Sequence, residues 1–127
     1  MNTVQLYLTA YCTLRDLFSK LQEEDLCNYI SEADPYLYNG NNGKPLICSN
    51  PDCYEKFRQY MLKHFKDGFI PKDKSYNAVL SHLREYVGNV YPGVIKAFLT
   101  ISKEEWTKIY EAGLEKFKDE KEENWQL

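Results

Sequence analysis

The chain has 127 residues, of which 43% are hydrophobic and 28% are charged, so its composition is that of one globular domain and excludes a disordered or collagen-like protein. Its formal net charge is -3, and the excess acid lies in residues 103–127, which hold 8 acidic and 5 basic residues against 11 of each in residues 1–102. Because a nucleic-acid binder usually presents a basic face, we expect no nucleic-acid partner.

Apolar residues recur at spacings of three and four over residues 4–21, which predicts a first helix of about five turns. A shorter second helix is predicted over residues 24–33, with its apolar residues on one face. Pro35 follows, and a proline ring pushes the residue before it out of the helical region. The second helix should therefore end at this point.

A long polar connection, rich in Gly and Asn, occupies residues 34 to about 50. Compact domains rarely contain a connection of about 15 residues or more unless it binds a ligand or is disordered. Its two short apolar pieces, 36–38 and 46–47, flank the turn-forming stretch 39–43. We expect a long loop that is either a tiny hairpin or a pair of extended segments.

Asn50 or Ser49 is predicted to cap a third helix, with Pro51 in the first turn, where the missing N–H of proline costs nothing. That helix should end at Asp67-Gly68. Apolar spacing predicts a fourth helix from Tyr76 to Val90, which must end before Pro92-Gly93. The dense apolar stretch 94–99 predicts a short buried helix.

Ser102 and Glu105 form a capping box, which predicts the start of a sixth helix. Gly88 and Gly113 interrupt helical patterns at a cost of about 1 kcal/mol each, which indicates close contacts between helices rather than ligand sites. The charged residues after Lys118 predict a solvated tail at 121–127, following one domain at 1–120. The expected fold is all-α: an irregular single-domain bundle of five or six helices with a long loop at about 34–50.

No catalytic or metal-binding signature is found. Cys53 lies near a predicted helix start, where the dipole lowers the pKa of a thiol, but two carboxylates flank it and His64 lies about three turns along the helix. Together with Cys48 and His82, these residues lack the paired spacing of structural zinc ligands. We expect no enzymatic activity, no bound metal and no cofactor.

Ser81 and His82 are adjacent, so on a helix they point about 100° apart and do not form a nucleophile and base. His82 is instead predicted at the boundary of the core. The N-terminal residues lack the pattern of a secretion signal, and no apolar run approaches the roughly 20 residues that span a bilayer. We expect a cytosolic protein, no membrane association, and four cysteines that remain thiols.

Tyrosines in the long loop suggest a binding surface. Tyr36 and Tyr38 lie among Asp and Asn residues, a composition typical of protein-recognition surfaces. The equally weighted alternative is that one tyrosine anchors the loop on the bundle. We place the expected binding site at Asp34, Tyr36, Tyr38, Asp52 and Glu55.

Several stretches carry a resemblance: Asp34-Pro35, then the Gly-containing loop, then the segment from Ser49 to Phe57, then Ala97-Phe98-Leu99 and Glu105-Trp106. Over roughly residues 1 to 112, the chain resembles a group of small bacterial helical proteins. Their middle segment reads Ser-Ala-Asp-Pro-Ala-x-Tyr-Glu-x-Phe. Here Asn50 replaces the aspartate and Asp52 the alanine, so an acidic group has moved by two places.

The resemblance implies a compact, cytosolic, helical protein. Size, acidity and architecture favour, by analogy, an immunity protein that neutralises a bacterial toxin domain. Such a protein needs a rigid scaffold with acidic groups and aromatic anchors. The alternative is a regulatory or self-associating interaction module. A third hypothesis, an enzyme with a site assembled from scattered polar residues, has no support in the sequence.

Overall fold

The computed structural model describes residues 1–36, 47 and 50–125. These residues form a single-domain arrangement of helices, which confirms the predicted all-α fold. A π-helical segment, η1, continues the fourth helix, and a short 3-10 helix, η2, follows the sixth. The elements in chain order are α1 (Thr3–Leu21), α2 (Glu24–Ala33), α3 (Pro51–His64), α4 (Lys72–His82), η1 (Leu83–Val87), α5 (Pro92–Phe98), α6 (Lys103–Lys116) and η2 (Glu122–Asn124).

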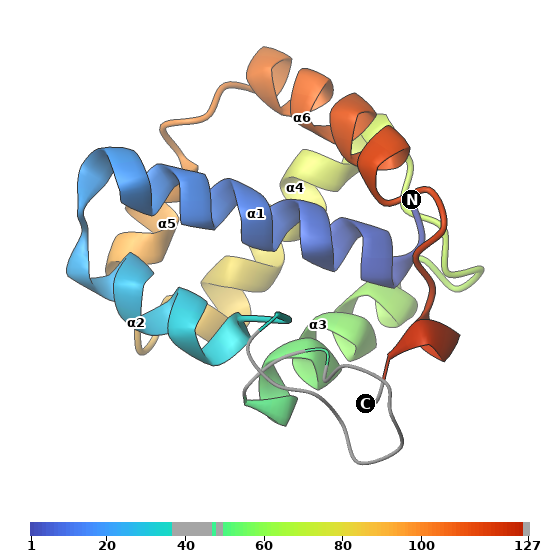
Figure 1. The fold of residues 1–127 in the computed structure, drawn as a ribbon, viewed down its shortest axis with the longest axis horizontal. Helices are drawn as coiled ribbons and strands as arrows, with labels where there is room; N and C mark the ends of the chain where they lie inside the picture. The colour runs from blue at the N-terminus through green and yellow to red at the C-terminus, as the bar shows by residue number, and fades with distance from the viewer. Residues whose placement is uncertain (37–46, 48–49, 126–127) are drawn as a thin grey trace.

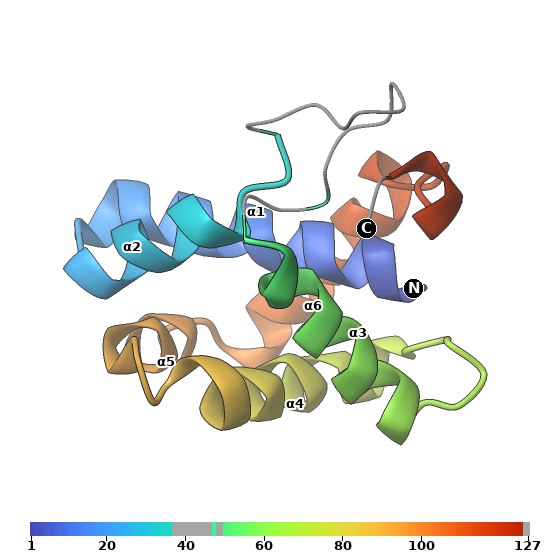
Figure 2. The ribbon, with the colours of Figure 1, turned by 90° about the horizontal axis from the view of Figure 1, so that it is seen from below.

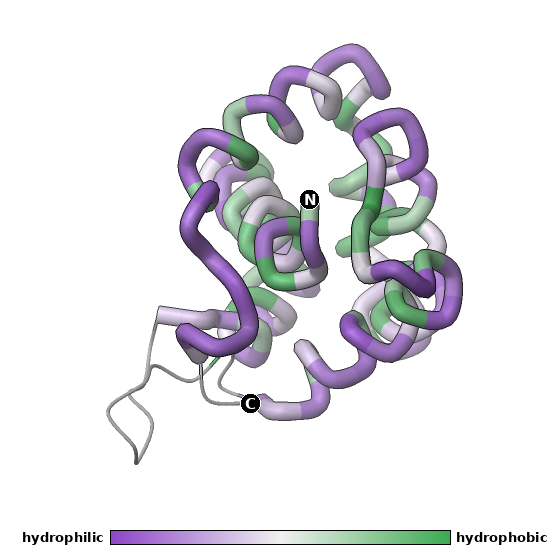
Figure 3. The backbone as a smooth tube through the Cα atoms, turned by 90° about the vertical axis from the view of Figure 1, so that its right-hand side faces the viewer, coloured by the Kyte–Doolittle hydropathy of each residue, from purple (hydrophilic) through white to green (hydrophobic). Residues whose placement is uncertain are grey.

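α1 is the central helix of the bundle. It packs against α2, α3, α5 and α6, which surround it in Figure 1. Buried residues occur on most of its circumference, as expected for a helix in contact with neighbours on several sides. Seen from below, α1 and α2 lie in one layer and α4 and α5 in the next (Figure 2). Hydrophilic segments lie mainly on the outside (Figure 3).

α2 and α3 bracket the long connection and begin where the sequence predicts. Asn50 caps α3, since its side-chain oxygen accepts a hydrogen bond of 3.1 Å from the backbone N–H of Asp52. The backbone N–H of Asn50 also donates to the carbonyl of Glu32 at 2.8 Å. This bond joins the start of α3 to the last turn of α2. The predicted hairpin falls almost entirely outside the described residues.

The fourth predicted helix does not stay regular as far as Val90. After His82 the chain forms η1, in which the N–H of Gly88 bonds to the carbonyl of Leu83 at 2.7 Å, five residues back. The wider π turn changes the angular position of the residues that follow. Val90, predicted on the inner stripe, therefore lies in a turn with 67% of its surface exposed.

The two glycines within helical patterns mark close helix contacts, as predicted. A Cβ atom added at Gly113 on α6 would lie 2.4 Å from the hydroxyl oxygen of Thr9 on α1. A Cβ atom at Gly88 would lie 2.3 Å from the terminal methyl of Ile95 on α5. Both distances are far below van der Waals contact, so glycine at these positions lets the helices approach each other.

The C-terminal segment differs from the predicted solvated tail. Glu122 accepts hydrogen bonds of 2.8 Å from Arg58 and from the hydroxyl of buried Tyr54. Trp125 is buried, and its indole N–H donates to Glu120 at 2.7 Å. The contacts of Glu122 join residues more than sixty positions apart, so the charge pattern of the segment did not predict them.

The prediction that His82 lies at the core boundary is wrong, because its side chain is only 2% exposed. Its ring packs against the rings of Phe57, Tyr60 and Tyr86, with centroid distances of 5.0, 5.7 and 5.5 Å. Nδ1 has no hydrogen-bond partner among the described residues. Burial lowers the pKa of His82 to about 4, so the imidazole is neutral in the folded protein at pH 7.

Candidate functional site

Asp34 and Tyr36 lie directly after α2. The Asp34 carboxylate accepts a hydrogen bond of 2.8 Å from the backbone N–H of Tyr36, which forms a turn. The Tyr36 ring meets the rings of Tyr11 and Trp125 edge-on, at centroid distances of 6.2 and 6.5 Å. Tyr36 nevertheless keeps 53% of its surface exposed. It therefore anchors this end of the loop and also presents an aromatic surface, while Tyr38 lies outside the described residues.

The phenol groups near this end of the loop are held neutral. Burial, reinforced by the Asp34 carboxylate, raises the pKa of Tyr11 to about 12. Burial and the neighbouring Cys12 raise the pKa of Tyr36. At physiological pH both hydroxyls are protonated, and their hydrogen bonds are made within the protein, between Tyr11 and Asp34 and between Tyr36 and Cys12.

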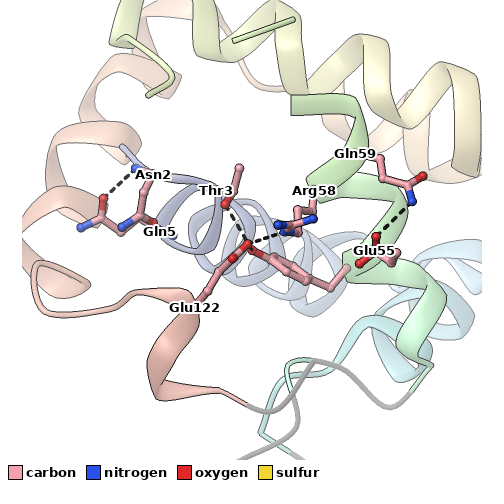
Figure 4. Close-up of polar contacts among 8 residues, drawn as sticks. Asn2, Thr3, Gln5, Glu55, Arg58, Gln59 and Glu122 are labelled. Atoms are coloured by element: carbon pink, nitrogen blue, oxygen red, sulfur yellow. Dashed lines mark hydrogen bonds and ion pairs between the residues drawn. The ribbon is translucent and has the colours of Figure 1, made fainter. Parts of the chain in front are cut away.

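Asp52 and Glu55 lie in the first two turns of α3. Asp52 is exposed, whereas the Glu55 carboxylate accepts a hydrogen bond of 3.0 Å from Gln59 on the same helix. Figure 4 shows this pair beside the separate contact between Arg58 and Glu122. The Glu55 carboxylate is thus engaged in an intrahelical contact.

A pocket of about 230 Å³ lies beside these residues, where the end of α2, the start of α3 and the chain from η1 to α5 meet. We call it the α2–α3 pocket. Of the four predicted binding residues that the structure describes, Asp34, Tyr36, Asp52 and Glu55, only Asp52 lines it. Its lining consists of Tyr29, Glu32, Asn50, Asp52, Cys53, Lys56, Tyr86, Val87, Val90 and Tyr91.

Three tyrosines in the α2–α3 pocket are fixed by contacts outside it or within its wall. Tyr86, with 40% of its surface exposed, packs against the rings of Tyr60 and His82 at 6.3 and 5.5 Å. The Tyr91 hydroxyl donates to Glu32 at 3.0 Å, and its ring lies 6.2 Å from that of buried Tyr29. The aromatic walls are therefore largely in place before any ligand arrives.

The pocket and the adjoining helix α2 are acidic. Glu32 and Asp52 contribute two carboxylates to the lining, against one ammonium from Lys56. Residues 21–36 contain five acidic residues and no basic one. These acidic residues are Glu23, Glu24, Asp25, Glu32 and Asp34. The surface that leads to the pocket along α2 therefore carries negative charge.

Reading the sequence missed most of this site. The run of acidic residues in 21–36 is visible in the sequence and could have indicated Glu32. Tyr86 and Tyr91 carried no such signal, because they approach α2 and α3 only through the path of η1 and the turn after it.

A second groove, of about 520 Å³, lies between α1 and α6. Its lining includes Leu17, Ile109 and Phe117, together with two acidic and two basic residues, Asp16, Glu105, Lys20 and Lys116. Unlike the α2–α3 pocket, it carries no aromatic cluster beside carboxylates, and Phe117 is its one aromatic lining residue among those described. We therefore take the α2–α3 pocket as the better candidate site.

Within the described residues, no cluster of three or more His, Cys, Asp or Glu side chains is arranged to hold a metal ion. In the same part of the chain, no helix combines the length and apolar character required to cross a bilayer. Cys12, Cys27 and Cys53 carry thiols. Comparisons with protein-family models, curated proteins and solved structures found no match to this chain.

Proposed function

We propose that this protein is a protein-binding domain whose partner docks on the acidic face around the α2–α3 pocket. The observation that carries the proposal is the exposure of Tyr86 and Val90 on the rim of a pocket that also holds Glu32 and Asp52. Aromatic anchors beside a concave, partly apolar site are characteristic of the residues that dominate binding energy at protein interfaces. Acidic groups around them add charge selectivity.

The charge of this face favours a basic partner. Complementary charge accelerates association and suppresses binding to acidic proteins. An immunity protein that neutralises a basic toxin domain fits this requirement and needs no catalytic group of its own. We therefore propose a toxin domain as the specific partner.

The alternative, a self-associating module, is less compatible with this face. In a two-fold symmetric dimer the same patch meets itself, so the carboxylates of α2 and the pocket would oppose one another. We expect light scattering to show a monomer at both low and high salt. A dimer that dissociates when Val90 is replaced by aspartate would favour self-association instead.

The proposed function predicts that a neighbouring gene encodes a toxin domain, and that domain is the partner used to test it. Binding is measured by isothermal titration calorimetry for the intact protein and for Tyr86→Ala and Val90→Ala. Because truncated interface anchors often cost about 2 kcal/mol or more, we expect these variants to bind at least about 30-fold more weakly. Phe69→Ala is the matched control, since the exposed fraction of Phe69, 55%, lies between those of Tyr86 and Val90, and Phe69 lies in the turn before α4.

Far-UV circular dichroism establishes that each variant is folded, which matters most for Tyr86 because its ring contacts His82. Val90 makes a second, independent probe, as its side chain is largely exposed. Equal affinity of all four proteins would remove the pocket from the interface. No binding of the intact protein to the toxin domain would refute the toxin as partner.

A further inference from the structure

We infer that the α2–α3 pocket receives the side chain of an arginine from the protein partner. This inference rests on the proposed function and adds to it the chemistry of the anchoring contact. It follows from three features of the pocket: its volume, its tyrosine rings and its carboxylates. Each feature selects against a different class of ligand.

The volume selects a single side chain. Pockets that hold drug-sized molecules or cofactors usually enclose about 300 to 1,000 Å³. The α2–α3 pocket, at about 230 Å³, is smaller than this range. It accommodates one extended side chain from a docked protein rather than a whole cofactor.

The tyrosines select a ligand that stacks on aromatic rings. Tyr29, Tyr86 and Tyr91 all line the pocket. A cation near such rings is attracted by their quadrupoles, and a flat guanidinium also stacks on their faces. Because Tyr91 donates a hydrogen bond to Glu32 and Tyr86 packs against His82, these two side chains lose little conformational entropy when a ligand binds.

The carboxylates select a positive charge. Glu32 uses one oxygen to accept from Tyr91, and its second oxygen lies on the same planar group beside the tyrosines. Asp52, at the start of α3, also lines the pocket and is exposed. Lys56 offsets only one of these two charges. Arginine is favoured over lysine because its planar fork donates several hydrogen bonds to carboxylates while stacking on aromatic rings.

The π-helical segment explains how the tyrosine wall is formed. η1 contributes Tyr86 and Val87 to the pocket directly after the buried His82. A π turn is rare and is found frequently at functional sites, because it re-aims side chains at a cost in helix regularity. Here that re-aiming places one face of Tyr86 against the core and leaves 40% of its surface exposed.

The test uses three tripeptides blocked at both ends, Gly-Arg-Gly, Gly-Lys-Gly and Gly-Leu-Gly, titrated into the whole ¹⁵N-labelled protein. We expect Gly-Arg-Gly to shift the amide resonances of residues 29–32, 50–56 and 86–91. We expect its affinity to exceed that of Gly-Lys-Gly by at least about threefold, and Gly-Leu-Gly to cause no localised shifts. A lysine peptide that binds as well as the arginine peptide overturns the inference, as does the absence of localised shifts for both.

Substitutions then test whether Glu32 and Asp52 contact the arginine side chain. Glu32→Gln and Asp52→Asn should each weaken Gly-Arg-Gly binding by about threefold, since each removes one carboxylate from a partly exposed pair. Asp52→Asn keeps the test valid if Glu32→Gln disturbs Tyr91, because Asp52 is exposed. Glu104→Gln, an exposed carboxylate in the first turn of α6, is the matched control and should have no effect. Equal weakening by the control would overturn the inference.

Failure of this inference is distinguishable from failure of the proposed function. If the toxin domain binds and Tyr86→Ala weakens it, while no arginine peptide shifts the pocket resonances, the function stands and the arginine contact is wrong. If the arginine peptide binds as described but no toxin domain does, the pocket chemistry stands and the proposed partner is wrong.

Discussion

Replacing His82 tests the most unusual polar group in the core. The imidazole is almost fully buried among Phe57, Tyr60 and Tyr86, and Nδ1 has no hydrogen-bond partner among the described residues. Protonation would place an unpaired charge in this aromatic cluster. We therefore expect the stability of the protein to depend on the protonation of His82, and His82→Leu, a change to an apolar side chain of similar volume, to remove that dependence.

The sign and magnitude follow from the pKa. Burial lowers the pKa of His82 from its ordinary value of 6.5 to about 4. Between these values the unfolded chain binds a proton that the native state does not, so the free energy of unfolding falls as the pH falls through this window. Well above pH 6.5 neither state binds the proton, and the contribution is constant. Each pKa unit corresponds to about 1.4 kcal/mol, so lowering the pH from 7 to 5 costs about 2 kcal/mol through this group.

The assay is urea unfolding followed by circular dichroism at pH 7 and pH 5. Carboxylates contribute equally to the intact protein and to His82→Leu, so the difference between their pH dependences isolates the imidazole. The matched control is His64→Gln, which removes the other histidine at an exposed position at the end of α3. If His82→Leu loses as much stability between pH 7 and 5 as the intact protein, the burial argument is refuted.

Three further predictions concern contacts that hold the helices together, each measured by urea unfolding. Gly113→Ala should lower the free energy of unfolding by about 1 to 3 kcal/mol through overpacking, and the better helix propensity of alanine should offset up to about 1 kcal/mol of this loss. Adding Thr9→Ala should restore part of the lost stability, because it removes the side chain that the new methyl group meets. Strictly additive effects of the two substitutions would contradict the proposed clash. Ser102→Ala should cost about 1 kcal/mol because it removes the cap of α6, and unchanged stability would show that the cap is dispensable. Glu122→Gln should lower the free energy of unfolding by no more than about 1 kcal/mol, because Glu122 and Arg58 each keep 34% of their side-chain surface exposed. A larger loss of stability, or a loss that does not depend on salt concentration, would contradict this expectation.

Much of the fold follows from local signals in the sequence. The spacing of apolar residues determines α1, and Pro35 limits α2. Asn50 and Ser102 mark the starts of α3 and α6, because a helix start needs side-chain acceptors for backbone N–H groups that have no partner within the helix. Each of these signals involves residues only a few positions apart, so it can be recognised without knowledge of the tertiary structure.

The sequence by itself therefore determined an all-α bundle and an acidic stretch at 21–36, whereas only the tertiary structure decided which residues line the α2–α3 pocket. Tyr91 meets Glu32 across 59 positions of the chain, and His82 is buried by rings from two elements. Glu122 likewise finds Arg58 sixty-four positions away. Burial and pairing at such separations depend on how helices pack, since a side chain's own neighbours in sequence do not specify which distant surface will cover it.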